Sequence, residues 1–136
     1  MAEVELAPAV RAFLDERRYA VLATINESGV PQVTAMWYEL QGDEVMMNTV
    51  AGRLKHRNLR RDPRVSVCIV DGERYVTLYG RVTLNDEQGQ AQQDDQRLAL
   101  RYDGPEKAAE RAPVIALQHR VTIRMAVTHV HARGFN

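Results

Sequence analysis

Short apolar runs, separated by turn signals at close spacing, are the feature that most constrains the fold of this chain. Such runs occupy residues 19–25, 30–40 and 44–50, with Asn26-Glu27-Ser28-Gly29 after the first and Gln41-Gly42-Asp43 after the second. Clusters of Gly, Asn, Asp and Ser between apolar runs are typical of turns between strands. Because no segment of crossover length separates these runs, we expect an antiparallel meander.

The second half of the chain continues the pattern. Runs at residues 65–70 and 75–82 are joined by Asp71-Gly72, a strong hairpin signal, and a last alternating run covers residues 120–127. Gly80, inside a strand pattern, predicts a bulge or a close backbone approach. Amphipathic or capped segments predict helices at residues 6–17, 53–61 and 85–102. We therefore expect a mainly β (α+β) fold, a six-stranded antiparallel barrel with a few peripheral helices, as one domain over residues 1–136.

The basic segment at residues 53–64 is the strongest candidate for a binding site. It holds six of the eighteen Lys and Arg residues, and Gly52 precedes it at the turn. A helix that begins after such a turn directs backbone N–H groups and the positive end of its dipole at a bound anion, commonly a phosphate. In a helix, Arg53, Arg57 and Arg60 fall in one stripe that faces solvent or a charged ligand. The periodicity alone is equally consistent with a solvated surface helix.

Bulk composition excludes several classes of protein. The formal net charge is zero and 45% of the residues are hydrophobic, which is typical of a globular domain and not of a general nucleic-acid binder. The single cysteine, Cys68, excludes an internal disulfide and agrees with a reducing compartment. The N-terminal residues lack an apolar signal region, and no apolar run approaches the length of a membrane span. We expect a cytoplasmic protein.

Two motifs carry a resemblance to a known family. Ala20-Val21-Leu22-Ala23-Thr24 is followed by Gly29-Val30-Pro31-Gln32-Val33-Thr34, and the basic segment reads Arg53-Leu54-Lys55-His56-Arg57-Asn58-Leu59-Arg60-Arg61-Asp62-Pro63-Arg64. With the order of elements, they resemble the flavin-binding split β-barrel family typified by pyridoxamine 5′-phosphate oxidase. Within it they are most similar to the deazaflavin (coenzyme F420)-dependent reductases of actinobacterial type. The similarity spans about residues 10–131 and implies an FMN-binding split barrel.

The resemblance implies a set of site residues. Arg53 and Lys55 would hold the cofactor phosphate, with Asn58 fixing the loop. The residues implied along the ring and its edge are Gln32, Val33, Thr34, Met47, Asn48 and Thr49. The family is a homodimer with cofactor sites at the interface, and Trp37 and Tyr79 are the candidates for the wall across the ring.

The implied activity is hydride transfer from reduced F420 to a conjugated small-molecule acceptor, with FMN as the alternative cofactor. The cofactor performs this chemistry, which agrees with the lack of any Ser/His/Asp or nucleophilic cysteine constellation, and no catalytic residue is assigned. Arg57, Arg60 and Arg61 would suit the anionic tail of F420, which FMN lacks. True pyridoxamine phosphate oxidases have a further C-terminal segment with an Arg and His motif, and this chain ends at Gly134-Phe135-Asn136. Oxidation of a B6 vitamer is therefore not expected.

Other functions fit the same pattern. A flavin or deazaflavin carrier without turnover, or a haem-binding protein, could use the same barrel. A nucleic-acid-binding barrel is less favoured because exposed aromatic residues do not cluster beside the basic segment. His129 and His131 alternate on the last predicted strand, but two histidines without a third ligand do not predict a metal site. The loop at residues 102–118 has no motif, so the substrate is not identified.

Overall fold

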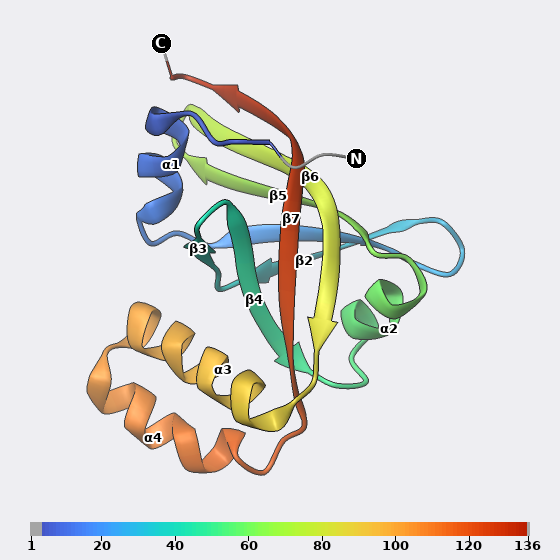
Figure 1. Ribbon diagram of the computed structural model, residues 1–136, viewed down its shortest axis with the longest axis vertical. Helices are drawn as coiled ribbons and strands as arrows, with labels where there is room; N and C mark the ends of the chain where they lie inside the picture. The colour runs from blue at the N-terminus through green and yellow to red at the C-terminus, as the bar shows by residue number, and fades with distance from the viewer. Residues whose placement is uncertain (1–3, 136) are drawn as a thin grey trace.

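The computed structural model describes residues 4–135, whose strands form one antiparallel sheet of seven strands (Figure 1). The strands are β1 (Ala20–Ile25), β2 (Pro31–Met36), β3 (Glu39–Gln41), β4 (Glu44–Val50), β5 (Arg64–Asp71), β6 (Arg74–Asn85) and β7 (Arg120–Arg133). The helices are α1 (Pro8–Asp15), α2 (Leu54–Arg61), α3 (Gln88–Asp103) and α4 (Pro105–Ile115). The expectation of a mainly β, antiparallel fold with peripheral helices is confirmed.

The strand order shows that the sheet curls into a barrel that is not closed, and we call the unpaired boundary between β2 and β3 the seam. The order is β2-β1-β5-β6-β7-β4-β3, so β2 and β3 are the two edges of the sheet. Only Trp37 and Tyr38 separate them in the chain. Three Cα steps span at most about 11 Å, so the two edges must lie close together although they are not paired. The result is the split barrel that was expected.

The expectation of one strand at residues 30–40 is wrong, because the chain forms two strands there, one on each side of the seam. β2 pairs with β1, whereas β3 pairs with β4, so the first runs form two hairpins on opposite edges instead of one meander. The chain leaves the sheet at Tyr38, whose backbone N–H donates to the Tyr102 hydroxyl at 3.0 Å. The Tyr38 hydroxyl in turn donates to the Leu14 carbonyl at 2.8 Å. These long-range contacts hold the break between β2 and β3, so one predicted strand becomes two and the sheet has seven strands. Sequence periodicity does not report such contacts.

The barrel interior holds the main hydrophobic core. It includes Leu22, Val67, Leu78 and Ile123 from four neighbouring strands, and Phe13 and Leu14 of α1 pack against it. β4 is buried on both faces, because Met47 points into this core while Met46 packs with Leu98 and Tyr102 of α3. Helix α3 therefore covers the outer face of β4.

Two predicted details are present at the β5–β6–β7 junctions. β5 and β6 pair from Asp71 opposite Arg74, with Gly72 at φ +61° in the turn, which confirms the hairpin. The β6–β7 register shifts between Tyr79 and Gly80, which confirms the bulge. β7 continues to Arg133, beyond the expected end at residue 127, and so includes both strand histidines. Within residues 4–135, no helix has the length and apolar character needed to cross a membrane.

Candidate functional site

A cleft of about 550 Å³ opens where the ends of β2 and β4 meet α2 and the α3–α4 pair. Polar and charged side chains make up much of its wall, and Met36, Leu98, Val114 and Ile115 supply an apolar part. The other residues that line the cleft are Thr34, Ala35, Trp37, Asn48, Thr49, Val50, Arg53, Lys55, Asp95, Arg111, Gln118 and Arg120. Four of these side chains are cationic and one is a carboxylate, so the cleft favours anions.

The α2 end of the cleft has unpaired positive charge. Arg53 is the N-cap of α2 and Lys55 lies in its first turn, and no side chain caps the helix. Lys55 is 7% exposed, yet neither residue forms an ion pair or a side-chain hydrogen bond within residues 4–135. Burial, together with the nearby charges of Arg53 and Arg120, lowers the pKa of Lys55. The side chain of Lys55 lines the cleft without a counter-ion in the described part of the chain, and a bound anion would supply one.

The turn before α2 differs in one respect from the expectation. Gly52 has φ +89°, the conformation that favours glycine. Its N–H, however, donates to Nδ1 of His56 at 2.9 Å and is not free for a ligand. Burial and the nearby Arg60 lower the pKa of His56, which keeps the ring neutral and able to accept this bond. The free amides are therefore those of the first turn of α2.

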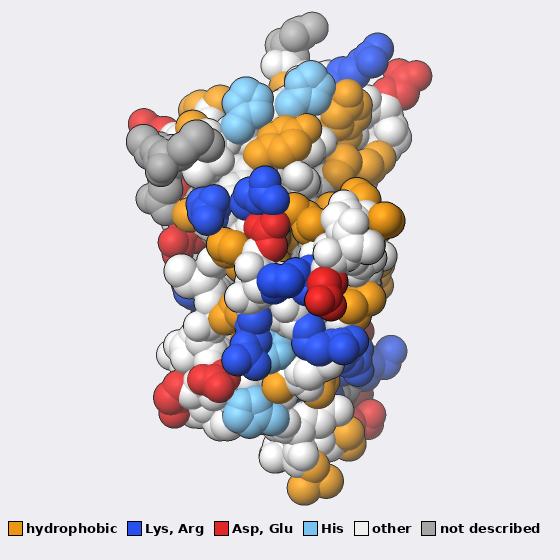
Figure 2. Space-filling view, turned by 90° about the vertical axis from the view of Figure 1, so that its right-hand side faces the viewer, with side chains coloured by type: hydrophobic (Ala, Val, Ile, Leu, Met, Phe, Trp, Pro, Cys, Tyr) orange, Lys and Arg blue, Asp and Glu red, His pale blue; other side chains and the backbone are white. Residues whose placement is uncertain are grey.

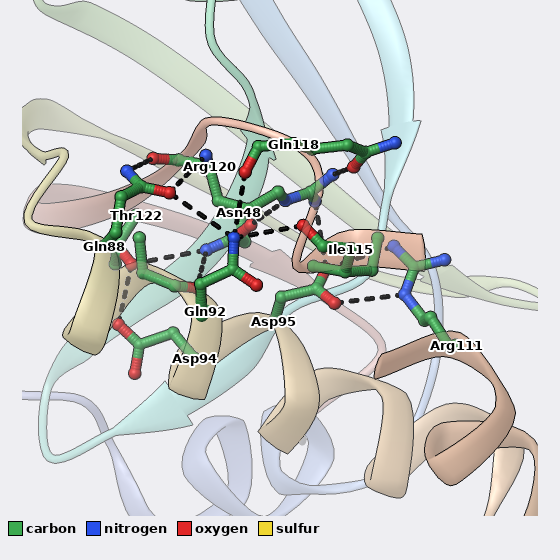
Figure 3. Close-up of polar contacts among 11 residues, drawn as sticks. Asn48, Gln88, Gln92, Asp94, Asp95, Arg111, Ile115, Gln118, Arg120 and Thr122 are labelled. Atoms are coloured by element: carbon green, nitrogen blue, oxygen red, sulfur yellow. Dashed lines mark hydrogen bonds and ion pairs between the residues drawn. The ribbon is translucent and has the colours of Figure 1, made fainter. Parts of the chain in front are cut away.

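The opposite wall is held by a network of buried polar side chains (Figure 3). Arg120 donates from Nε to Asn48 at 2.8 Å and from Nη2 to Asp95 at 2.9 Å. Asp95 also accepts two hydrogen bonds from Arg111 of α4, each at 3.0 Å. The network therefore joins β4, α3, α4 and β7 around one carboxylate.

The cleft brings together six of the residues predicted for the site. Thr34, Trp37, Asn48, Thr49, Arg53 and Lys55 all line it. The amide group of Asn48 is fully engaged, since Nδ2 donates to the Ala91 carbonyl at 2.9 Å while Oδ1 accepts from Arg120. Asn48 therefore orders the wall, whereas the hydroxyl of Thr49 makes no hydrogen bond to the part of the chain described.

The other predicted residues lie outside this cleft. The Met47 side chain is fully buried in the barrel core, so only its backbone can face a ligand there. Asn58 is buried and donates to Thr24 and Asn26, which ties α2 to the β1 end, as its predicted role in fixing the loop requires. Gln32 bonds Thr24 and Thr34, and Val33 is 59% exposed on the outer face of β2.

Two of the three arginines in the predicted stripe face solvent away from the cleft. Arg57 and Arg60 are exposed and do not line the cleft, so the groove of arginines expected for an anionic tail is not part of it. Figure 2 views the side on which α2 lies and shows Lys and Arg side chains gathered across this face. Tyr79 lines a separate cavity of about 540 Å³ on the outside of the sheet, with Thr24, Arg64 and Arg81.

Sequence reasoning missed Asp95, Arg111, Gln118 and Arg120. Within the predicted helix at residues 85–102, the pair Asp94-Asp95 by itself predicts a solvated face, but Asp95 is 2% exposed. A signal was present, because Asp95 lies four residues after Ala91 and three before Leu98, on the apolar stripe of the predicted helix. A carboxylate on a buried stripe requires a cationic partner.

Comparisons with known proteins identify the family of this chain. A family model described as pyridoxamine 5′-phosphate oxidase matches residues 6–133. The F420H(2)-dependent biliverdin reductase of Mycobacterium tuberculosis is 29% identical over 112 residues, covering 81% of this chain and 82% of that protein. A solved structure named F420 reductase has TM-score 0.77 and 28% identity, covering 93% of this chain and 98% of that one. The solved structure of a conserved hypothetical protein from Mycobacterium tuberculosis has TM-score 0.79 and 29% identity, covering 97% of this chain and 87% of that one.

Proposed function

The chain belongs to the pyridoxamine 5′-phosphate oxidase family of oxidoreductases, and from this premise we propose that it uses F420 to reduce a conjugated small molecule. The observation that carries the proposal is the pair Arg53 and Lys55, which lie at the start of α2 without a carboxylate partner among residues 4–135. This donor set fits a cofactor phosphate. The same segment supplies uncapped amide groups, the usual companions of a phosphate at a helix N-terminus.

One observation supports F420 ahead of FMN. The similar biliverdin reductase and one similar solved structure are both named for F420. FMN remains the second candidate, because the family is typified by a flavin enzyme.

The residues of this chain would bind and orient the cofactor and keep water from it. Arg53 and Lys55 would fix the phosphate, and Thr34 and Thr49 offer hydroxyl groups along the strand ends. Leu98 and Val114 form the apolar part of the cleft that excludes water. F420 in its reduced form supplies the hydride, so the protein contributes position and electrostatics.

We also propose that the protein is a homodimer through the outer face of the sheet. One row across five strands is Ala35, Val21, Cys68, Thr77 and His131, and the next is Val33, Ala23, Ser66, Tyr79 and His129. Neither row contains Lys, Arg, Asp or Glu, and Val21, Val33 and Tyr79 are exposed by 39%, 59% and 41%. An uncharged, partly apolar face of this breadth is typical of an interface.

Titration with F420 and, separately, with FMN tests the proposed cofactor. We expect quenching of cofactor fluorescence with tight F420 binding and weak FMN binding. Lys55→Ala should weaken F420 binding by about 10-fold to 100-fold, the range for a charge-assisted hydrogen bond to phosphate. Lys107→Ala removes the other lysine, which is exposed on α4, and should leave the affinity unchanged.

Each outcome of the titration has a clear meaning. Preference for FMN would make the protein a flavin oxidoreductase of the same family. Equal loss in both lysine variants would mean that the effect is one of net charge and not of the α2 site. If neither cofactor binds, the phosphate site at Arg53 and Lys55 is wrong.

A further inference from the structure

Arg111 lies on the wall of the cleft that a phosphate at α2 leaves unused. Helices α2 and α4 lie on opposite sides of the lower end of β4 (Figure 1). Arg53 and Lys55 belong to the α2 side, whereas Arg111 belongs to α4 and also lines the cleft. Arg111 is therefore a candidate contact for a second anionic group, distinct from the phosphate.

The guanidinium of Arg111 is held in place before any ligand arrives. Nε and Nη2 donate to Asp95, both at 3.0 Å, and the guanidinium carbon lies 5.1 Å from the centroid of the Trp37 ring. Trp37 is itself stacked on Tyr102, with centroids 5.1 Å apart and planes 9° apart. A side chain fixed in this way loses little further conformational entropy when it binds a ligand.

Arg111 also keeps capacity to bind an anion. Its Nη1 makes no hydrogen bond to residues 4–135, and 34% of its side chain is exposed. Arg120, in contrast, is 6% exposed and uses Nε, Nη1 and Nη2 for Asn48, Gln118 and Asp95 (Figure 3). Because Asp95 is shared by both arginines, it neutralises only one of them. The excess positive charge is accessible at Arg111.

The surroundings of Arg111 indicate the chemistry of the ligand. Leu98, Val114 and Ile115 line the same part of the cleft and present apolar surface. An apolar wall with one fixed guanidinium suits a planar, mostly apolar molecule that carries a carboxylate, since arginine binds carboxylates in a forked geometry.

We propose that Arg111 is a specificity-determining residue that binds a carboxylate of the acceptor, with Asp95 as its positioning residue. The inference rests on the proposed function and adds that the acceptor is a conjugated carboxylic acid. A carboxylate in the tail of F420 has the same chemistry, so the test must separate the two sources.

Fluorescence of Trp37, the only tryptophan of the chain, reports binding at this position directly. The probes are benzoate and benzamide, which have similar shapes but differ in charge, titrated at constant ionic strength into the F420-loaded and the free protein. We expect benzoate to bind about tenfold more tightly than benzamide, as one charge-assisted contact allows. Arg111→Gln should remove this preference, and Lys107→Gln, which removes a charge from the exposed side of α4, should retain it.

A parallel F420 titration, followed by the deazaflavin signal, identifies the source of the carboxylate. If Arg111→Gln leaves F420 affinity within about twofold, Arg111 serves the acceptor, because a lost contact to the tail would cost about tenfold. A loss of F420 affinity equal to the loss of benzoate affinity would overturn the proposal in favour of the cofactor tail. Equal binding of benzoate and benzamide by the unmodified protein would overturn it as well.

Two further measurements keep the inference testable. If wild-type protein fails to bind F420 while benzoate preference persists, the proposed function fails and the carboxylate site stands. Asp95→Glu keeps the negative charge beside both arginines but displaces the carboxylate from its two contacts with Arg111, so it should reduce benzoate preference while F420 affinity stays within about twofold. Unchanged benzoate preference in Asp95→Glu would remove the positioning role, and the wild-type comparison decides the matter if Arg111→Gln does not fold.

Discussion

Lys55 shows how a single residue can couple a binding site to pH. It lies at the cleft with 7% of its surface exposed, and burial lowers its pKa from the ordinary value of lysine. Only the protonated form attracts a phosphate. Cofactor affinity should therefore be constant at neutral pH and fall as the pH rises through this lowered pKa, earlier than an ordinary lysine would allow.

Dissociation constants for F420, measured from neutral pH to about pH 10, would test this dependence. Lys55→Arg is the matched variant, because arginine stays protonated throughout this range. Its affinity should be independent of pH where that of the wild type falls. An identical pH profile for both proteins would show that another group controls binding.

Tyr38 is the residue that holds the seam between β2 and β3. Its side chain is fully buried and its hydroxyl donates to the Leu14 carbonyl. Tyr38→Phe removes this donor from the buried Leu14 carbonyl and should lower the free energy of unfolding by about 1–2 kcal/mol. Urea denaturation at neutral pH measures the change.

The same residue makes a prediction for alkaline pH. Burial, and then the neighbouring Tyr102, raise the pKa of Tyr38 from 10.0 to about 12. Between these values the unfolded chain has lost the proton that the folded protein keeps, so stability falls as the pH rises through this window. Below pH 10 the tyrosine is protonated in both the folded and the unfolded chain, so it causes no loss of stability there. The wild type should therefore lose more stability than Tyr38→Phe from pH 10 to pH 12, and parallel curves would contradict the assignment.

At the scale of elements, the bulge in β6 depends on Gly80. A Cβ at this position would lie 1.9 Å from the Ala126 carbonyl oxygen of β7, which is backbone and cannot rotate away. Gly80→Ala should destabilise the protein by about 3 kcal/mol, the upper part of the range for overpacking. Thr83→Ala, at an exposed position of the same strand, should change stability by about 0.5 kcal/mol or less. Thermal unfolding of both variants tests the contrast, and equal melting temperatures would contradict it.

The elements also show where sequence patterns were sufficient. The hairpin at Gly72 was predicted because its turn depends on a backbone conformation local to a few residues, and the bulge was predicted because Gly80 interrupts an alternating strand pattern. The break at Tyr38 was not predicted, because it depends on contacts with Leu14 and Tyr102, which are far away in the chain. Asp95 was assigned to solvent because its partner arginines lie on other elements.

At the scale of the whole molecule, the two uncharged rows on the outer face of the sheet predict self-association. A glutamate in either row would have to be buried without a partner in the proposed dimer. Val21→Glu and Val33→Glu should therefore each shift the protein from dimer to monomer in sedimentation equilibrium. Leu100→Glu, a substitution of an exposed residue on α3, should remain dimeric.

A monomeric wild type at the same concentrations would contradict the proposed dimer. It would not affect the proposals about the cleft, because all the residues that line the cleft belong to one chain. If Leu100→Glu also dissociated, added negative charge in general would be responsible, and the outer face would lose its assignment. The predicted place of Tyr79 across the ring depends on the dimer, because Tyr79 of the same chain lines a different cavity.

The sequence by itself determined the antiparallel β class and the helix after the third predicted strand, because periodicity and turn chemistry act over a few residues within one segment. The resemblance to the family implied that Arg53 and Lys55 bind a phosphate, which stays a prediction. Only the tertiary structure decided that the sheet splits at Trp37 and Tyr38 and that Arg57 and Arg60 face away from the cleft. It alone brought Arg111 of α4 and Arg120 of β7 to Asp95 of α3, because long-range packing sets which elements meet.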